Sequence, residues 1–115
     1  MKLFKEKSVV KLNSTIIQPK KIKENKVREI VILHGLLGRG IRWQAIGNWL
    51  SSNFGLKIHL VDLRNHGTSE HHPEMCYLAI TNDLNLYFED NKIQNSLLIG
   101  HSMVHLALPF NQLCC

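Results

Sequence analysis

The sequence predicts an α/β domain built on a mostly parallel β-sheet. Three short apolar runs, at residues 29–33, 56–61 and 96–99, have the length and composition of buried strands. The segments between them carry apolar residues at helical spacing, so strand and helix alternate. Short links between such elements favour crossover connections and parallel strands. With 115 residues, 44% of them apolar, the chain can form one small core.

The basic charge lies in the first 28 residues. They hold nine Lys or Arg residues against Glu6 and Glu24, although the whole chain has a net charge of only +5. Such runs are usually solvated, and we interpret residues 1–28 as a basic N-terminal lead-in. Only Phe4 could supply an aromatic contact to a base, so no nucleic-acid partner is expected. A mitochondrial presequence stays open as an alternative, although it would favour Arg and avoid Glu.

The lead-in ends in two β-branched runs and a polar linker. Val9-Val10 and Thr15-Ile16-Ile17 flank Asn13-Ser14, which predicts a weak hairpin over Ser8–Gln18 without a preferred glycine turn. The linker, Pro19–Lys26, is rich in lysine.

The first strong strand is Glu29–Leu33, which is apolar without alternation and ends in the glycine-rich loop His34–Gly38. Residues 41–52 are expected to form a helix whose apolar face comprises Trp43, Ile46, Trp49 and Leu50. Gly55 follows, where a helix C-cap takes a positive φ.

The second half repeats this order. A strand over Leu56–Val61 leads into a long loop from Asp62 to Met75. Tyr77–Phe88 has helical spacing through Tyr77, Ile80, Leu84 and Phe88, although Cys76 is a poor N-cap. The third strand, Ser96–Ile99, ends at Gly100-His101-Ser102.

The chain has no apolar run long enough to span a membrane and no apolar segment of a secretory signal near its start. Its three cysteines, Cys76 and the adjacent Cys114 and Cys115, have the spacing of neither a disulfide framework nor a metal site. We therefore expect an intracellular protein, cytoplasmic or mitochondrial, with no integral membrane segment and no secretion.

Three motifs follow the three strands in order. They are His34-Gly35-x-x-Gly38, Asp62-x-Arg64-Asn65-His66-Gly67-x-Ser69 and Gly100-His101-Ser102-Met103. Together they resemble the α/β-hydrolase fold, and within it the esterase branch of the YbfF-type esterases and abhydrolase domain-containing protein eleven. The resemblance implies a three-layer, mostly parallel sheet, of which residues 29–103 would form the N-terminal half.

The resemblance also implies a serine hydrolase that cleaves a small-molecule carboxylic ester or related acyl bond. Ser102 would be the nucleophile, and the backbone N–H groups of Leu36 and Met103 would form the oxyanion hole. No metal or organic cofactor is implied. A serine at this position, in place of an aspartate, argues against epoxide hydrolase or dehalogenase chemistry.

The other polar residues of the motifs have structural interpretations. His34 would shape the oxyanion loop, and Asp62 and His66 would order their own loop through hydrogen bonds. The neighbouring His71 and His72 resemble a metal pair, but adjacent residues rarely converge on one ion and no third ligand is near. Trp43 and Trp49 are expected to be core or groove-wall aromatics.

Residues 104–115 depart from the family pattern. Val104 stands where the motif has its second glycine, and Pro109 would break a following helix. No acid follows Ser102, and His105 is too close in sequence to act as its base. We therefore expect residues 104–115 to be a divergent tail, as from a truncated or mis-spliced gene, and the chain to be inactive.

The alternative is a non-catalytic binding or regulatory fragment. Strand 96–99 would lack a neighbour on one side and expose an apolar edge. Oligomeric state and acyl length are not predicted.

Overall fold

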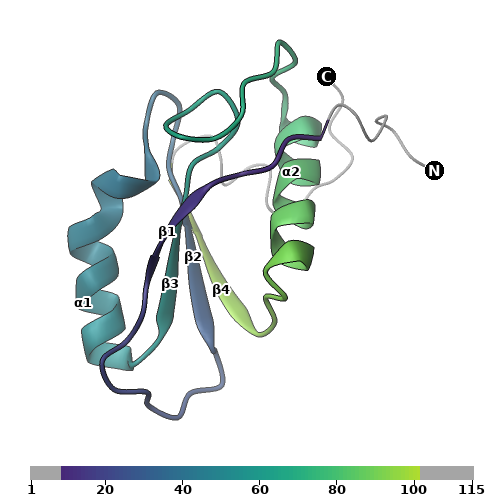
Figure 1. Cartoon of the computed structure of the whole chain (residues 1–115). Helices are drawn as coiled ribbons and strands as arrows, with labels where there is room; N and C mark the ends of the chain where they lie inside the picture. Colours follow the sequence, from purple (N-terminus) through teal and green to yellow (C-terminus); the bar gives the residue numbers. More distant parts are fainter. Residues whose placement is uncertain (1–8, 102–115) are drawn as a thin grey trace.

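The computed structural model describes residues 9–101 as a four-stranded sheet with one helix on each face (Figure 1). The strands are β1 (Ser14–Ile17), β2 (Glu29–Leu33), β3 (Lys57–Val61) and β4 (Ser96–Gly100), in the sheet order β1-β3-β2-β4. β2 pairs in parallel with both β3 and β4, and β1 pairs antiparallel with β3. The predicted parallel sheet is therefore confirmed, with strand bounds within one residue of expectation.

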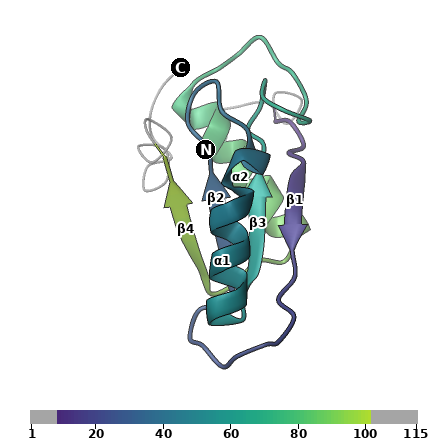
Figure 2. The same cartoon turned by 90° about the vertical axis from the view of Figure 1, so that its left-hand side faces the viewer.

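Alternate residues of the central strands enter two separate cores. Ile30 and Ile32 of β2 pack toward α1 (Gln44–Phe54), whereas Val31 and Leu33 pack toward α2 (Tyr77–Asp90). Figure 2 shows α1 in front of the sheet and α2 behind it. A strand buried on both faces needs apolar residues at every position, which explains the lack of alternation in β2.

The apolar face expected for residues 41–52 is confirmed in part: Trp43 and Leu50 pack against the core on the α1 side of the sheet, but Ile46 and Trp49 do not. A 3₁₀ turn, η2 (Gly40–Trp43), precedes α1. The buried residues of α1 itself are the small residues Gly47 and Ser51. Ile46 and Trp49 are instead 49% and 59% exposed. A Cβ at Gly47 would lie 2.8 Å from Ile17 Cδ1, so small residues let this helix lie close against the sheet.

Helix α2 buries the predicted face. Ile80 and Leu84 are buried, and Tyr77 and Phe88 pack against the same core. Cys76 is the N-cap, and its sulfur accepts a hydrogen bond from Ala79 N–H at 3.4 Å.

The weak hairpin expected over Ser8–Gln18 is not present in its described part. Only Ser14–Ile17 forms a strand, and it pairs with β3. Val10 is buried in the α2-side core, and its backbone N–H donates to Asp83 Oδ1 of α2 at 2.9 Å. The two β-branched runs therefore do not pair with each other, because each contacts a segment farther along the chain: Val10 contacts α2, and Thr15–Ile17 pair with β3.

β4 forms one edge of the sheet, next to β2. Leu97 and Leu98 are both exposed, as expected for an apolar strand without a second neighbour. Among the helices of residues 9–101, none is long and apolar enough to cross a membrane.

Candidate active site

The carboxyl ends of β2, β3 and β4 meet at one end of the sheet, and all three motifs follow these ends. The connection from β2 leads to β3 on one side, and the chain then returns to β4 on the other. Open α/β sheets place ligands at such a switch point. His101 N–H donates to Leu33 O at 3.0 Å, which holds the residue before Ser102 beside the end of β2.

His34 fixes the loop that follows β2. Its Nε2 accepts a hydrogen bond from Leu63 N–H at 3.0 Å, so Nδ1 carries the proton and donates to Gly35 O at 2.7 Å. Burial lowers the pKa of His34 below its ordinary 6.5, and the neutral ring is the form that can make both bonds. The expectation that His34 shapes this loop is confirmed.

The same bonds set the direction of the Leu36 N–H group. Gly35 O accepts from His34 and also from Gly38 N–H at 2.9 Å. The Gly35–Leu36 peptide is trans, so its N–H is directed away from that oxygen. Within residues 9–101 this N–H donates no hydrogen bond, and Leu36 is 55% exposed. No residue among 9–101 therefore competes with a ligand oxygen for this N–H.

Asp62 organises the loop that follows β3. Its carboxylate accepts from Gly40 N–H at 2.7 Å, from Thr68 N–H at 2.9 Å and from the Thr68 hydroxyl at 2.8 Å. Burial alone would raise the pKa of Asp62, but the hydrogen bonds from Thr68 and Gly40 lower it overall. Gly67 has a φ of 51°, and a Cβ there would collide with this carboxylate. The structural interpretation of Asp62 is confirmed.

His66 connects the two loops. Its Nε2 accepts from Leu37 N–H at 3.0 Å, and its Nδ1–H donates to Arg64 O at 2.8 Å. Its ring also lies 4.8 Å from that of His34, measured between centroids. The sequence predicted that His66 orders its own loop; its bond to the loop after β2 was not anticipated.

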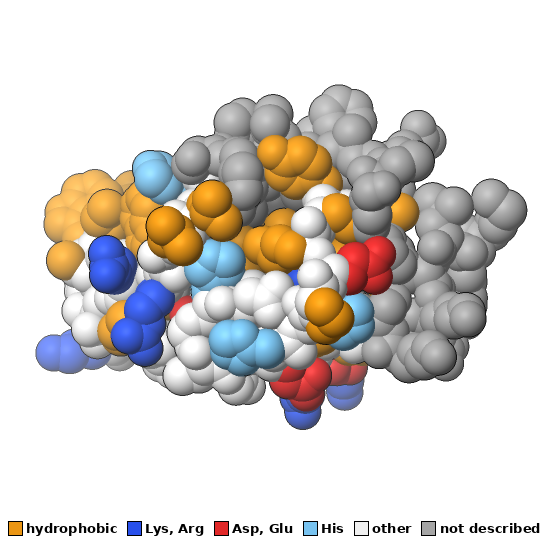
Figure 3. Space-filling model, turned by 90° about the horizontal axis from the view of Figure 1, so that it is seen from above, with side chains coloured by type: hydrophobic (Ala, Val, Ile, Leu, Met, Phe, Trp, Pro, Cys, Tyr) orange, Lys and Arg blue, Asp and Glu red, His pale blue; other side chains and the backbone are white. Residues whose placement is uncertain are grey.

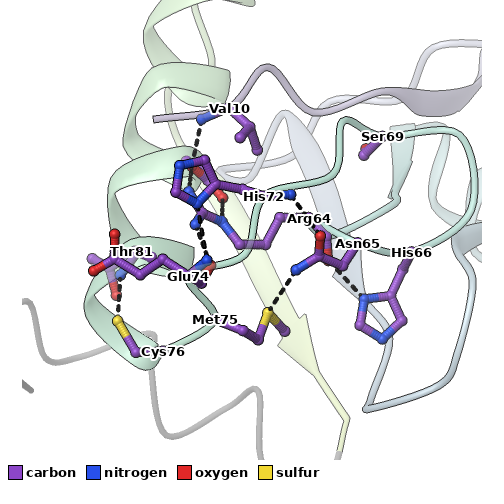
Figure 4. Close-up of polar contacts among 12 residues, drawn as sticks. Val10, Arg64, Asn65, His66, Ser69, His72, Glu74, Met75, Cys76 and Thr81 are labelled. Atoms are coloured by element: carbon purple, nitrogen blue, oxygen red, sulfur yellow. Dashed lines mark hydrogen bonds and ion pairs between the residues drawn. The ribbon is translucent and has the colours of Figure 1, made fainter. Parts of the chain in front are cut away.

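Arg64 is anchored deep in the protein (Figure 4). Its guanidinium donates to Asp83 from Nε at 2.6 Å and from Nη2 at 2.8 Å, and Nη1 donates to Glu74 O at 2.6 Å. Burial raises the pKa of the Asp83 carboxyl, while Arg64 and Val10 N–H act in the opposite direction. Sequence reasoning missed Asp83, although an acid inside the apolar face of a helix was a usable signal.

An open groove of about 570 Å³ lies at this end of the sheet. Figure 3 looks onto this end and shows hydrophobic and histidine side chains close together. The groove is lined by His34, Gly35, Leu36, Leu37, Gly38, Arg39, Arg42, Trp43, Ile46 and His101. Trp43 is thus a groove-wall residue, with its ring 5.4 Å from that of His101, whereas Trp49 is exposed.

A second hollow, of about 700 Å³, lies at the amino ends of the strands, between residues 22–28 and Leu56. It is remote from all three motifs.

His72, one of the histidine pair, uses its Nδ1 to accept from Glu74 N–H at 3.0 Å. Residues 9–101 contain no group of three or more His, Cys, Asp or Glu side chains placed to hold a metal ion.

Two of the three expected site residues, Ser102 and Met103, lie outside the described residues, as does the divergent tail from Val104. Leu36 lies in the groove beside His101. The described structure therefore brings together the loop after β2 and the residue that precedes the expected nucleophile.

The chain is similar to several known proteins. A probable alcohol acetyltransferase of Saccharomyces cerevisiae is 33% identical over 98% of this chain. The sn-1-specific diacylglycerol lipase ABHD11 of Xenopus laevis is 40% identical over 64% of it. A marine microorganism esterase of known structure superposes with a TM-score of 0.69 at 32% identity, over 82% of the chain.

The chain spans 37%, 24% and 33% of the length of these three proteins, respectively. This share is smaller than the half that the motifs led us to expect. A family profile described as the alpha/beta hydrolase fold matches residues 29–103, which are the residues that carry the three motifs. The chain therefore belongs to the α/β-hydrolase fold family.

Proposed function

We propose that this chain supplies the oxyanion loop and the nucleophile of a serine hydrolase acting on small-molecule carboxylic esters. Ser102 is the nucleophile, and the N–H groups of Leu36 and Met103 bind the oxygen that becomes negative. The esterase and lipase among its relatives support this reaction class. No cofactor is required for it.

The observation that carries the proposal is the Leu36 N–H. In residues 9–101 the N–H groups of its neighbours Leu37 and Gly38 both donate hydrogen bonds, whereas that of Leu36 does not. It belongs to a peptide held rigidly at its oxygen, and it lies in an open groove. Rigid donors aimed at a site of developing charge are what an oxyanion hole requires.

In the proposed reaction Ser102 Oγ attacks the ester carbonyl and its proton passes to a base. The tetrahedral oxyanion collapses to an acyl-serine and releases the alcohol, which takes up the proton. Water then attacks the acyl-serine, which releases the carboxylic acid and regenerates Ser102. A base and an acid are needed, and residues 103–115 contain only His105 as a titratable side chain other than cysteine. We therefore propose that residues 1–115 alone have no turnover.

A graft tests this proposal. Residues 104–115 are replaced by the corresponding remainder of the Saccharomyces cerevisiae relative, which we expect to supply further strands, an acid and a histidine. We expect a cooperative melt, labelling of Ser102 by a fluorophosphonate and hydrolysis of p-nitrophenyl acetate. Ser102→Ala should abolish labelling and turnover, and the ungrafted chain should show neither.

Two results would contradict the proposal. A graft that folds but leaves Ser102 unlabelled would favour the non-catalytic fragment. Turnover by the ungrafted chain that is lost in Ser102→Ala would mean that a base exists among residues 1–115.

Acyl transfer to an alcohol is a second candidate, favoured by the relative that covers nearly the whole chain. It uses the same acyl-serine, which an alcohol attacks in place of water. Adding ethanol to the graft reaction and measuring ethyl acetate against acetate separates the two activities.

We also propose that residues 1–28 act as a mitochondrial address. Nine basic residues against two acidic ones support it. Fused to a fluorescent protein, these residues should direct it to mitochondria, and a diffuse cytosolic signal would discard the idea.

A further inference from the structure

We propose that His66 is a positioning residue for the oxyanion hole, acting on Leu36 through the backbone of Leu37. This inference rests on the proposed function and assigns a role in it to a residue outside the groove. His66 does not line the groove, so it is not expected to touch the substrate.

Leu36 has a peptide on each side, and each is held by a different histidine. The preceding peptide is held at Gly35 O by His34 Nδ1–H, at 2.7 Å. The following peptide is held at Leu37 N–H by His66 Nε2, at 3.0 Å. Because a peptide is planar, fixing the two peptides fixes the φ and ψ of Leu36 and hence the direction of its N–H.

Leu37 needs this support. Its φ is 63°, in the left-handed region that leucine rarely adopts. Its side chain is 83% exposed, so packing does not hold it in place. Its backbone hydrogen bond to His66 is the contact that opposes relaxation at this residue, together with the turn closed by Gly38 N–H.

His66 is itself held by the protein interior. Its Nδ1–H donates to Arg64 O, and the Arg64 guanidinium is paired with Asp83 on α2. The free lone pair of Nε2 is thereby aimed at Leu37 in a defined tautomer. The oxyanion loop is thus connected to the buried ion pair through one imidazole.

Two substitutions at His66 distinguish the role of its Nε2 from that of its Nδ1. In His66→Gln the amide oxygen can reach the position of Nε2 and accept from Leu37 N–H, whereas in His66→Asn the shorter amide can replace only the Nδ1 donor. We expect the Leu37 amide of the 115-residue chain to exchange its hydrogen at least tenfold faster in His66→Asn. In His66→Gln the exchange rate should stay near that of the original chain.

The kcat and KM of the same two variants are then measured in the grafted enzyme. We expect kcat to fall at least tenfold in His66→Asn with KM within twofold, because the oxyanion donor acts in the transition state. His66→Gln should recover most of kcat, and the two variants should melt at similar temperatures.

The inference is overturned if the two variants exchange the Leu37 hydrogen equally fast, or if His66→Asn leaves kcat unchanged in an active graft. An inactive graft with unlabelled Ser102 would contradict the proposed function itself. An active graft that is indifferent to the Asn and Gln choice would remove the role of His66 and leave the proposed function intact.

Discussion

At the scale of single residues, Arg64 and Asp83 form a buried ion pair that links distant segments of the fold. Both side chains are almost completely buried, at 0% and 1% exposure. The carboxylate also accepts Val10 N–H, so it joins α2, the loop after β3 and the segment before β1. Removing one member of a buried ion pair is strongly destabilising, because the charge of the other member then lies in the interior without its opposite charge.

We predict that Asp83→Asn lowers the free energy of unfolding by about 3–5 kcal/mol. The substitution keeps the shape of the side chain but removes the negative charge that accepts two hydrogen bonds from the Arg64 guanidinium. Urea denaturation measures the change, and Glu89→Gln, an exposed acid on the same helix, should stay within about 0.5 kcal/mol. Equal effects at the two positions would mean that the pair contributes no more than a surface charge.

The buried His34 predicts a loss of stability in mild acid. Its pKa is lowered by burial, so as pH falls through 6.5 the unfolded chain takes up the proton first and folding becomes less favourable. The slope contributed by one such histidine is at most about 1.4 kcal/mol per pH unit. Burial of His59 acts in the same direction, and the raised pKa of Asp83 acts in the opposite one at lower pH.

We therefore expect a shallower decrease in unfolding free energy between pH 7.5 and 5.5 in His34→Asn than in the unaltered chain. Urea titrations at several pH values give both profiles. The His34 ring resonances should in addition titrate below pH 6.5. Parallel profiles, or titration above 6.5, would contradict the assignment.

At the scale of elements, the position of α1 depends on its smallest residues. Gly47 faces Ile17 of β1 and Leu60 of β3, and the large side chains Ile46 and Trp49 point outward. A helix can approach a sheet this closely only where it presents little side-chain volume.

Gly47→Leu should therefore lower the free energy of unfolding by about 1–3 kcal/mol through overpacking. Ala45→Leu places the same side chain at an exposed position of the same helix and should change it by less than about 0.5 kcal/mol. Thermal and urea unfolding compare the two. A neutral Gly47→Leu would show that the helix can move away from the sheet at little cost.

At the scale of the whole molecule, the exposed edge of β4 is where we expect residues 9–101 to self-associate. β4 pairs only with β2, and Leu97 is 49% exposed. An apolar edge strand of this kind is a template for pairing with another copy.

Leu97→Lys should reduce concentration-dependent self-association, because a charge on an edge strand opposes further pairing. Sedimentation velocity over a range of concentrations measures it. Ile99→Lys is the matched contrast: Ile99 packs against the α1-side core, so that variant should lose stability instead. Unchanged association of a folded Leu97→Lys variant would place the contact elsewhere.

Local pattern in the sequence is enough to predict the alternation of strands and helices, the glycine loops at the strand ends, and the family. Each of these depends on local pattern: continuous apolar runs such as 29–33, the helical spacing of 77–88, and motifs of fixed spacing. His34 and Asp62 were also predictable as loop-ordering residues, since all their partners except Gly40 lie within the motifs themselves.

The buried face of α1, the pairing of β1 and the contacts of His66 and Asp83 could not be predicted and are seen only in the folded chain. Each of these contacts joins segments far apart in the chain, as with Val10 and Asp83 or Leu37 and His66. Residue type constrains such pairs weakly, because a histidine or aspartate can find a hydrogen-bond partner in many places. The choice depends on which loops the parallel sheet brings to the same end, and that is a property of the folded chain.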